Sequence, residues 1–249
     1  MPIKEQFFRY RIITNLYCNM QPNCYFCYQP NKDPALLLDI EKMKNTFNKC
    51  GRKMKRATIM GGESTILPNL HEYIELTKEN VEEDVCLVTN GILLDEDRII
   101  RYACSGLTEV AISISSLPMY LSRRDQAILC RKYIPNTRIN IPKCNESNGD
   151  ALVEILKHIL RDGFYVVVCE DLMGRYGKFD FEEKLPAVKI KDDGCCFFDY
   201  TWEGHQFGVF GNYKGYNSTD IIITPVGTFS RWDDYCKKIG NTCLNGKDT

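Results

Sequence analysis

Short apolar runs rich in β-branched residues alternate with longer segments of helical period between residue 9 and about residue 170. Apolar runs of this length favour buried strands, and apolar residues spaced three and four apart favour helices that pack on a sheet. Six runs have the strand pattern: RYRIIT (9–14), RATIM (56–60), VCLVT (85–89), EVAISI (109–114), TRINI (137–141) and FYVVVC (164–169). After a wider first gap they recur about every 25 to 30 residues. The pattern therefore predicts parallel strands joined by crossover helices.

The segments between these runs carry residues that typically begin and end helices. Asp side chains accept hydrogen bonds from the first N–H groups of a helix, and glycine follows the last turn because it adopts left-handed backbone angles without strain. Three helices have both ends marked in this way: from Asp33 and Pro34 to Gly51, from Asp95 to Gly106, and from Asp150 to Gly163. Two more helices are expected over about 69–80 and 121–133.

Six strand-helix units are too few for a closed eight-stranded barrel but suit an open, partial (β/α)6 barrel of TIM type. A doubly wound sheet is the alternative architecture. Past residue 172 the chain becomes aromatic and glycine-rich, with turn residues between β-rich runs, so we expect two or three antiparallel strands between 197 and 235. The expected fold class is α/β, with a barrel core over 1–171 and a small β-rich extension over 172–249 that covers the barrel.

Composition limits the classes of partner. The chain has 249 residues, of which 32 are basic and 33 acidic, and its formal net charge is -1. The net charge therefore gives no electrostatic attraction toward nucleic acid or an anionic membrane. The basic run GRKMKR (51–56) is interpreted as a solvated helix end. Because no apolar run is long enough to span a bilayer and no signal peptide begins the chain, we expect a cytoplasmic protein. Its 13 cysteines are then not expected to form disulfides, since cytosolic thiols are kept reduced.

Polar and glycine-rich residues follow the predicted strands, at the rim where parallel α/β folds carry their active sites. Cys18, Cys24 and Cys27 follow the first strand with the spacing C-x5-C-x2-C. The later strands carry or precede GGEST (61–65), Asn90 and Gly91, the serines within 113–116, then Arg138, Asn140 and Lys143, and finally Glu170 and Asp171. Each group alone also suits a turn, a helix cap or a surface ion pair. Their coincidence on one rim indicates a functional site.

This combination resembles the radical S-adenosylmethionine (radical SAM) superfamily, in the same order and over residues 9 to about 170. Members of that family share a partial barrel, a cysteine triplet after the first strand and a GGE motif after the second. The usual triplet is C-x3-C-x2-C, so two extra residues separate Cys18 from Cys24 here. The resemblance explains why there are three thiols, because a [4Fe–4S] cluster held by three cysteines leaves one iron for S-adenosylmethionine.

The resemblance implies an enzyme with a [4Fe–4S] cluster and S-adenosylmethionine as cofactors. An electron from a flavodoxin- or ferredoxin-type donor would cleave S-adenosylmethionine to methionine and a 5′-deoxyadenosyl radical, which abstracts hydrogen from the substrate. The residues that match family positions are Cys18, Cys24 and Cys27 as cluster ligands, Phe26 against the adenine, Gly61, Gly62 and Glu63 at the methionine ammonium, and Asn90, Ser113, Ser115, Arg138 and Asn140 in the rest of the cofactor-binding set. The segment CEDLMG (169–174) is expected to support the adenine through its backbone.

The carboxy-terminal quarter is similar to a shortened, twitch-like form of the SPASM extension, in which family members carry extra clusters. The similarity lies in ITPVGTF (223–229) and CKKIGNTC (236–243). It implies an auxiliary cluster on Cys195, Cys196, Cys236 and Cys243, although the cysteine that the family places soon after the glycine is absent. The alternative is a small β-cap whose thiols stay reduced or bind zinc.

The substrate is open between a small molecule and a peptide or natural product. Because the chain begins a few residues before the first strand, a leader-dependent peptide maturase is expected to need its recognition domain on a partner. A hypothesis of another class is a non-catalytic α/β scaffold in which the three cysteines and a distant fourth hold zinc. The GGE motif counts against that scaffold, since zinc binding gives no reason for it.

Overall fold

The structure is a computed structural model that describes residues 8–20, 24, 27, 29, 33–169, 179–192, 197–211 and 219–240. The chain divides into two compact units: residues 1–110, 132–136 and 217–249 form the first, and residues 111–131 and 137–216 form the second. Three elements, β4 (Glu109–Ser113), α4 (Leu117–Tyr133) and β5 (Asn136–Pro142), have residues in both. The fold is of the mixed α/β class with parallel strands, as in a partial TIM-type barrel. The expected domain boundary near residue 171 does not coincide with this division and stays a prediction.

The sheet of the first unit has the strand order β11-β10-β1-β2-β3. Its strands are β1 (Phe8–Ile13), β2 (Arg56–Met60), β3 (Val85–Thr89), β10 (Thr219–Thr224) and β11 (Gly227–Phe229). β10, β1, β2 and β3 are parallel, with Ile12 aligned to Ile223 on one side and to Ile59 on the other. β11 pairs with β10 in the antiparallel direction. The chain thus returns from residue 219 to lie beside its own first strand.

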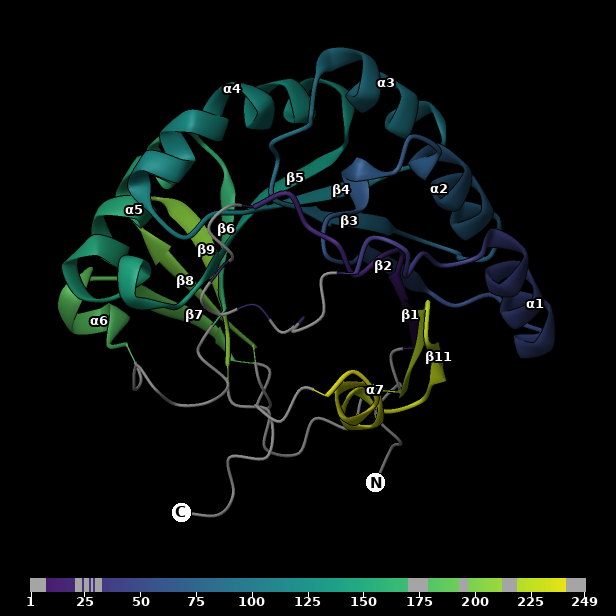
Figure 1. Ribbon diagram of the computed structural model, residues 1–249. Coiled ribbons are helices and arrows are strands. Elements are labelled where there is room, and N and C mark those ends of the chain that lie inside the picture. The colour runs from purple at the N-terminus through teal and green to yellow at the C-terminus, as the bar shows by residue number, and fades with distance from the viewer. Residues whose placement is uncertain are drawn as a thin grey trace. The chain divides into compact units, whose positions relative to one another are not determined.

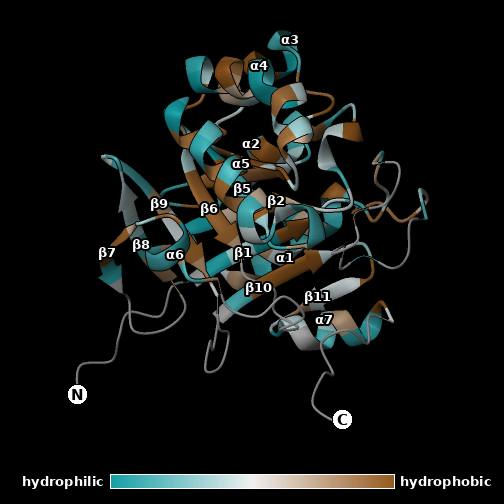
Figure 2. Cartoon of the chain, turned by 90° about the vertical axis from the view of Figure 1, so that its left-hand side faces the viewer, coloured by the Kyte–Doolittle hydropathy of each residue, from teal (hydrophilic) through white to brown (hydrophobic). Residues whose placement is uncertain are grey.

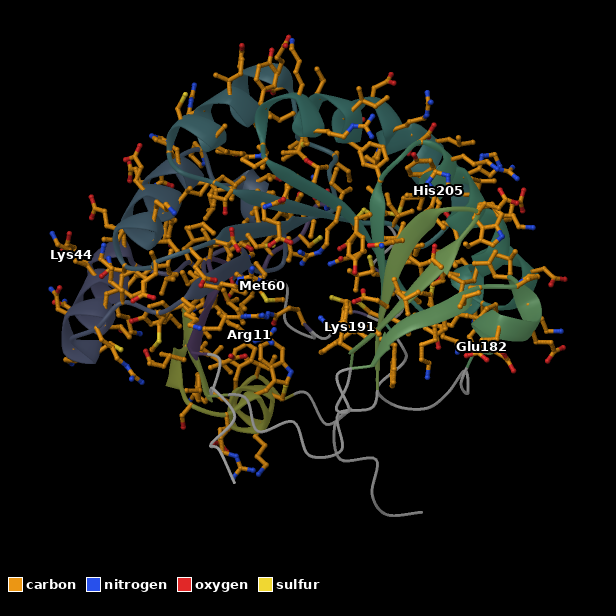
Figure 3. All side chains as sticks on the ribbon, turned by 180° about the vertical axis from the view of Figure 1, so that it is seen from behind. Arg11, Lys44, Met60, Glu182, Lys191 and His205 are labelled. Carbon is orange, nitrogen blue, oxygen red and sulfur yellow. The ribbon has the colours of Figure 1, made fainter. Side chains whose placement is uncertain are left out.

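Side chains of β1 alternate between two covered faces. Tyr10 and Ile12 are fully buried toward α1 (Ile40–Cys50), and the Tyr10 ring meets the Phe47 ring edge-on with centroids 4.7 Å apart. Ile13 points the other way and packs with Tyr235 of α7 (Trp232–Lys238). Figures 1 and 3 show the same arrangement, with α1 and α7 on opposite faces of the sheet and Arg11 on the face away from α1. Both faces of β1 are therefore covered, which explains its largely apolar sequence.

The helices of the first unit confirm most of the predicted ends. α2 (Leu70–Glu79) occupies the expected range, and α3 (Glu96–Cys104) begins after Asp95, whose side chain accepts from the Arg98 N–H at 2.8 Å. α1 ends at Gly51, which has a left-handed φ of 66°. Figure 2 shows α3 with both hydrophilic and hydrophobic residues, as a helix with one buried side requires.

The predicted start of α1 at Asp33 and Pro34 is wrong. Asp33 forms a local turn by accepting from the Ala35 N–H at 2.9 Å, and the helix is capped instead by Asp39. The intervening residues are held extended against the end of β1, because the Leu38 N–H donates to Thr14 O at 2.8 Å and Leu37 bridges to Asn15. A long-range pairing thus delays the helix by six residues.

The second unit has the strand order β5-β6-β9-β8-β7. Its elements are β5 (Asn136–Pro142), α5 (Gly149–Arg161), β6 (Tyr165–Cys169), α6 (Phe181–Lys184), β7 (Val188–Asp192), β8 (Phe197–Trp202) and β9 (His205–Phe210). β5, β6 and β9 are parallel, whereas β9, β8 and β7 form an antiparallel meander. α5 begins one residue before Asp150, after Asn148, with no side-chain cap.

The expected antiparallel strands of the carboxy-terminal quarter are present but are only part of the arrangement. β8 with β9, and β10 with β11, are antiparallel hairpins. One strand of each hairpin then joins a predicted barrel strand in parallel: β9 pairs with β6, and β10 with β1. Across the parts of the chain that the structure describes, no helix is both long and apolar enough to cross a membrane.

Candidate active site

The loop that carries the GGE motif lies directly on the backbone that follows β1. The Gly62 N–H donates to Asn15 O at 2.9 Å, and the Glu63 N–H donates to Tyr17 O at 2.7 Å. A Cβ atom on Gly62 would stand 2.0 Å from Tyr17 O, and one on Gly61 would stand 2.8 Å from Asn15 O. Both glycines are therefore needed for this contact, which places the GGE loop against the first residues of the cysteine loop.

Glu63 is buried and its carboxylate is fully engaged within the protein. Oε1 accepts from the Thr65 N–H at 3.1 Å and from the hydroxyls of Thr65 and Thr89 at 2.7 Å each, and Oε2 accepts from the Asn90 N–H at 2.7 Å. The side chain is only 2% exposed, so these four donors are what makes a buried charge tolerable. Glu63 thus joins the loop after β2 to the end of β3.

Asn90 extends this network to the cysteine loop. Its Nδ2 donates to Asn19 Oδ1 at 2.8 Å and lies 3.9 Å from Cys18 Sγ, while its Oδ1 accepts from the Ile92 N–H at 3.0 Å. The Met20 N–H also points at Cys18 Sγ, at 3.5 Å. Two N–H groups therefore face the first cysteine sulfur.

The other two cysteines of the triplet lie on a turn. The Cys27 N–H donates to Cys24 O at 3.0 Å, and Cys27 Sγ lies 3.8 Å from Gln29 O. All three cysteines are half-buried. Within the described ranges, no three His, Cys, Asp or Glu side chains already stand at metal-binding separation. The structure therefore places the cysteine loop, the GGE loop and Asn90 in contact. The three cysteine sulfurs in it are farther apart than a shared metal site requires.

The predicted cofactor residues of the second unit lie on or after β4 and β5. Ser113 ends β4, and Ser115 donates to Met119 Sδ at 3.7 Å. Arg138 and Asn140 share one face of β5, with the Arg138 Nε donating to Asn140 Oδ1 at 3.1 Å. Burial raises the pKa of the Cys169 thiol on β6 to about 11, and the Arg138 charge partly opposes this shift.

Lys143, at the end of the same strand, is 2% exposed, and its Nζ lies 5.9 Å from the centre of the Phe179 ring. A lysine so deeply buried keeps its aliphatic stem away from water and needs polar or aromatic contacts for its charge.

Several predicted residues fall outside the described ranges. These are Phe26, the segment 170–174 and three of the auxiliary-cluster cysteines, Cys195, Cys196 and Cys243. The fourth, Cys236, is 1% exposed and packs with Ile13, Leu16 and Ile222. The auxiliary cluster and the adenine contact stay predictions.

Several residues of the network were missed by sequence reasoning, among them Asn15 and Asn19. Asn15 holds the GGE loop with its side chain as well as its backbone, since Nδ2 donates to Glu63 O at 2.9 Å and Oδ1 accepts from the Gly62 N–H at 3.1 Å. Asn19 accepts from Asn90. An asparagine after a strand is most often a turn residue, so nothing in the local sequence separated these two from the rest.

A parallel α/β fold with three thiols after its first strand and GGE after its second defines a class of iron–sulfur enzymes that use S-adenosylmethionine. The comparison with family models agrees, because the radical SAM superfamily model matches residues 12–168, more than half of the chain. The chain therefore belongs to the radical SAM superfamily. It is an enzyme, and its cofactors are a [4Fe–4S] cluster and S-adenosylmethionine.

Curated relatives are similar over part of the chain only. It is 27% identical over 108 residues to GTP 3′,8-cyclase of Synechococcus sp. (strain CC9902), covering 42% of this chain and 31% of that protein. It is 32% identical over 113 residues to the probable GTP 3′,8-cyclase of Methanocaldococcus jannaschii, covering 42% of this chain and 35% of the relative. The matched segment is thus about a third of the length of these relatives.

Among solved structures, Streptococcus suis SuiB bound to its precursor peptide SuiA has a TM-score of 0.57 and 16% identity, covering 72% of this chain and 43% of that one. anSMEcpe with bound AdoMet and a peptide has a TM-score of 0.54 and 16% identity, covering 70% of this chain and 55% of that one. These likenesses show the fold.

The residues of the first unit fit the two cofactors of the family. Thiolates are the ligands of iron–sulfur clusters, and hydrogen bonds to their sulfurs tune a bound cluster; the N–H groups of Met20 and Asn90 would have this role if Cys18 held the cluster. Gln29, two residues after Cys27, adds an acceptor: its Oε1 is buried and finds no donor among the residues that the structure describes. The site thus has sulfur ligands and spare hydrogen-bonding capacity in one loop.

Proposed function

We propose that the protein reductively cleaves S-adenosylmethionine at a [4Fe–4S] cluster held by Cys18, Cys24 and Cys27, with the electron supplied by a flavodoxin- or ferredoxin-type donor. The observation that carries the proposal is the contact network in which the GGE loop and Asn90 reach the cysteine loop. When bound, the cluster and its cosubstrate supply a 5′-deoxyadenosyl radical that takes a hydrogen atom from the substrate.

The chain's own residues have three tasks in this proposal. The cysteine loop supplies sulfur ligands, with Met20 and Asn90 donating N–H groups toward Cys18. Gly61 and Gly62 bring their backbone close to that loop, where carbonyl groups serve as acceptors for an ammonium. Glu63 holds the GGE loop against the end of β3, because its carboxylate accepts four hydrogen bonds from Thr65, Thr89 and Asn90. The rigid network thus positions the reacting groups.

The first prediction concerns the cluster ligands. Incubated without oxygen with dithionite and S-adenosylmethionine, the reconstituted wild type is expected to release 5′-deoxyadenosine, and Cys24→Ala is expected to release at least about 100-fold less because a ligand is lost. Chromatographic quantification of 5′-deoxyadenosine checks this. Cys104→Ala, which changes an exposed cysteine on α3 of the same unit, is the control and keeps the wild-type rate.

Equal release from wild type and Cys24→Ala would contradict the assignment of the ligands. Metal content separates the proposal from the zinc scaffold: protein purified without oxygen is expected to contain iron and sulfide. A colourless protein with stoichiometric zinc would refute the radical mechanism for this chain.

The substrate is the finer part of the proposal, and we take it to be a small molecule or a peptide. Because the curated relatives are named GTP 3′,8-cyclases, GTP is the first compound to test. A substrate increases the rate of 5′-deoxyadenosine release over the basal rate and, when deuterated at the reacting position, transfers deuterium to that product. If GTP does neither, the nucleotide is excluded and peptide substrates are tested next.

A further inference from the structure

α7, which lies outside the matched family region, is fixed firmly to the first unit. Tyr235 of this helix is fully buried, and its ring lies 5.4 Å from that of Trp232 and 5.7 Å from that of Phe229. Together with Cys236 it packs against Ile13 and Ile222, one from each of the neighbouring strands β1 and β10. The helix therefore has a defined position relative to β1.

Charged residues secure the same helix from the side of the sheet. Arg11 of β1 pairs with Asp220 of β10 at 2.5 Å, and the Asp220 carboxylate is only 3% exposed. The Arg11 guanidinium also lies 5.8 Å from the centre of the Trp232 ring. β1, β10 and α7 are thus joined by a buried ion pair and an aromatic contact in addition to apolar packing. Figure 3 shows Arg11 on this face of the sheet, together with Met60.

From this position the Tyr235 hydroxyl reaches the cysteine loop. It accepts a hydrogen bond from Gln29 Nε2 at 2.7 Å, across 206 positions of sequence, and both residues are buried. Burial raises the pKa of Tyr235, the nearby Cys236 and Cys27 raise it further, and the Gln29 hydrogen bond partly opposes them. The hydroxyl therefore stays protonated at any ordinary pH.

Gln29 is in turn joined to the third and second cysteines. Gln29 lies two positions after Cys27, and its backbone carbonyl oxygen accepts from the Cys27 thiol at 3.8 Å. The Cys27 N–H donates to Cys24 O. Because a metal-bound thiolate has no S–H to donate, the link from α7 through Tyr235 and Gln29 to the cluster cysteines is the short main-chain connection from position 29 to position 27, together with the hydrogen bond between Cys27 and Cys24.

We infer that Tyr235 is a positioning residue for the cluster: by holding Gln29 it fixes the cysteine loop in the conformation that retains the [4Fe–4S] cluster. The inference rests on the proposed cluster ligands. It gives the carboxy-terminal segment a role in cofactor retention that needs no auxiliary cluster, and it assigns a use to a buried glutamine that family motifs do not include.

The test is the rate at which reconstituted protein loses cluster iron to a chelator, followed by the decay of the cluster absorbance. Tyr235→Phe removes the hydroxyl and keeps the ring, so the packing of α7 is retained. Loss of iron is expected to be about fivefold faster than in wild type, the factor that corresponds to one net hydrogen bond. Gln29→Leu is expected to match it, and the double variant to be no faster than either single variant.

A matched control separates this role from a general effect on stability. Tyr120→Phe removes another buried tyrosine hydroxyl, one bonded to Asp162 in the second unit, and is expected to lose iron at the wild-type rate. Thermal unfolding of the metal-free proteins should place Tyr235→Phe close to Tyr120→Phe. Two results would overturn the inference: iron loss from Tyr235→Phe as slow as from wild type, or additive effects of Tyr235→Phe and Gln29→Leu in the double variant.

The two hypotheses fail in different ways. If the proposed ligands are wrong, Cys24→Ala still takes up a cluster, whatever Tyr235 does. If only the inference is wrong, Cys24→Ala takes up none and Tyr235→Phe retains its cluster as wild type does.

Discussion

The GGE motif has a packing role in this protein. Gly62 has no room for even one carbon beyond its backbone, and Glu63 has its carboxylate occupied by three neighbouring residues. The sequence indicated that these residues belong to the site, but not that they hold it together. That role depends on Asn15, Tyr17 and Thr89, which are distant in sequence and carry no motif.

Gly62→Ala should displace the cysteine loop, because the added Cβ would lie 2.0 Å from Tyr17 O. We expect a loss of about 3 kcal/mol in the free energy of unfolding, at the upper end of the overpacking range, together with poor cluster uptake. Urea unfolding and iron content after reconstitution measure the two effects. Gly51→Ala is the control: it strains a left-handed φ of 66° in open space and should cost about 1 kcal/mol with normal iron content. Normal iron content in Gly62→Ala would contradict the close contact.

Glu63→Gln should destabilise the protein even without cofactors. A glutamine side chain has one acceptor oxygen and one NH2 group. Its NH2 group would therefore face a buried donor that now donates to a carboxylate oxygen of Glu63. We expect a loss of about 2–4 kcal/mol in the free energy of unfolding of the metal-free protein. Glu79→Gln, on the exposed side of α2, should change it by less than about 0.5 kcal/mol. Equal urea midpoints for the two variants would show that Glu63 has no structural role.

The bounds of helices and strands were predicted well where the local pattern of apolar residues determines them. They were predicted poorly where pairing with a distant segment determines them. β2, β3 and α2 lie where the pattern of apolar residues put them: β2 and α2 each bury one side, and β3 is a short apolar run that is buried on both faces. The start of α1 was misplaced because residues 36–38 pair with the end of β1, and a pairing of this kind leaves no local mark. The parallel pairing of β10 with β1 was missed for the same reason.

The contact between α4 and α5 gives a pH-dependent prediction. Asp162 accepts two hydrogen bonds from Arg124 at 2.7 Å each, and these bonds, with a smaller contribution from Tyr120, lower the pKa of Asp162. A carboxyl whose folded pKa is lowered stabilises the fold above its unfolded pKa of about 3.9, and this contribution is lost as pH falls through the folded value.

Asp162→Asn should therefore lower the free energy of unfolding at pH 7 by about 1 kcal/mol, a value discounted for the partial exposure of the pair. The difference from wild type should shrink below about pH 4 and disappear at lower pH. Urea unfolding across pH checks this, with Asp125→Asn on the exposed side of α4 as the control. A difference that is constant with pH would mean that the carboxylate charge is not the cause.

For the whole molecule, the sequence predicted the fold class and the family more fully than the arrangement of the chain. The alternation of strands and helices and the order of the motifs required no knowledge of long-range pairing. The division into two units did require such knowledge, since it depends on the pairing of β9 with β6 and of β10 with β1. The carboxy-terminal quarter was expected as a small β-rich extension that covers the barrel, and the structure describes strands in it that pair directly with the predicted barrel strands β6 and β1.

The return of the chain to β1 also sets an order of events in time. Contacts across some 200 positions form late, because the distant segment must first be synthesised and then brought back. Arg11 has no Asp220 and Gln29 no Tyr235 until those residues have left the ribosome. Firm retention of an iron–sulfur cluster should therefore be reached only after residue 235 has left the ribosome, and nascent chains arrested before residue 219 should lose cluster iron faster than the full chain.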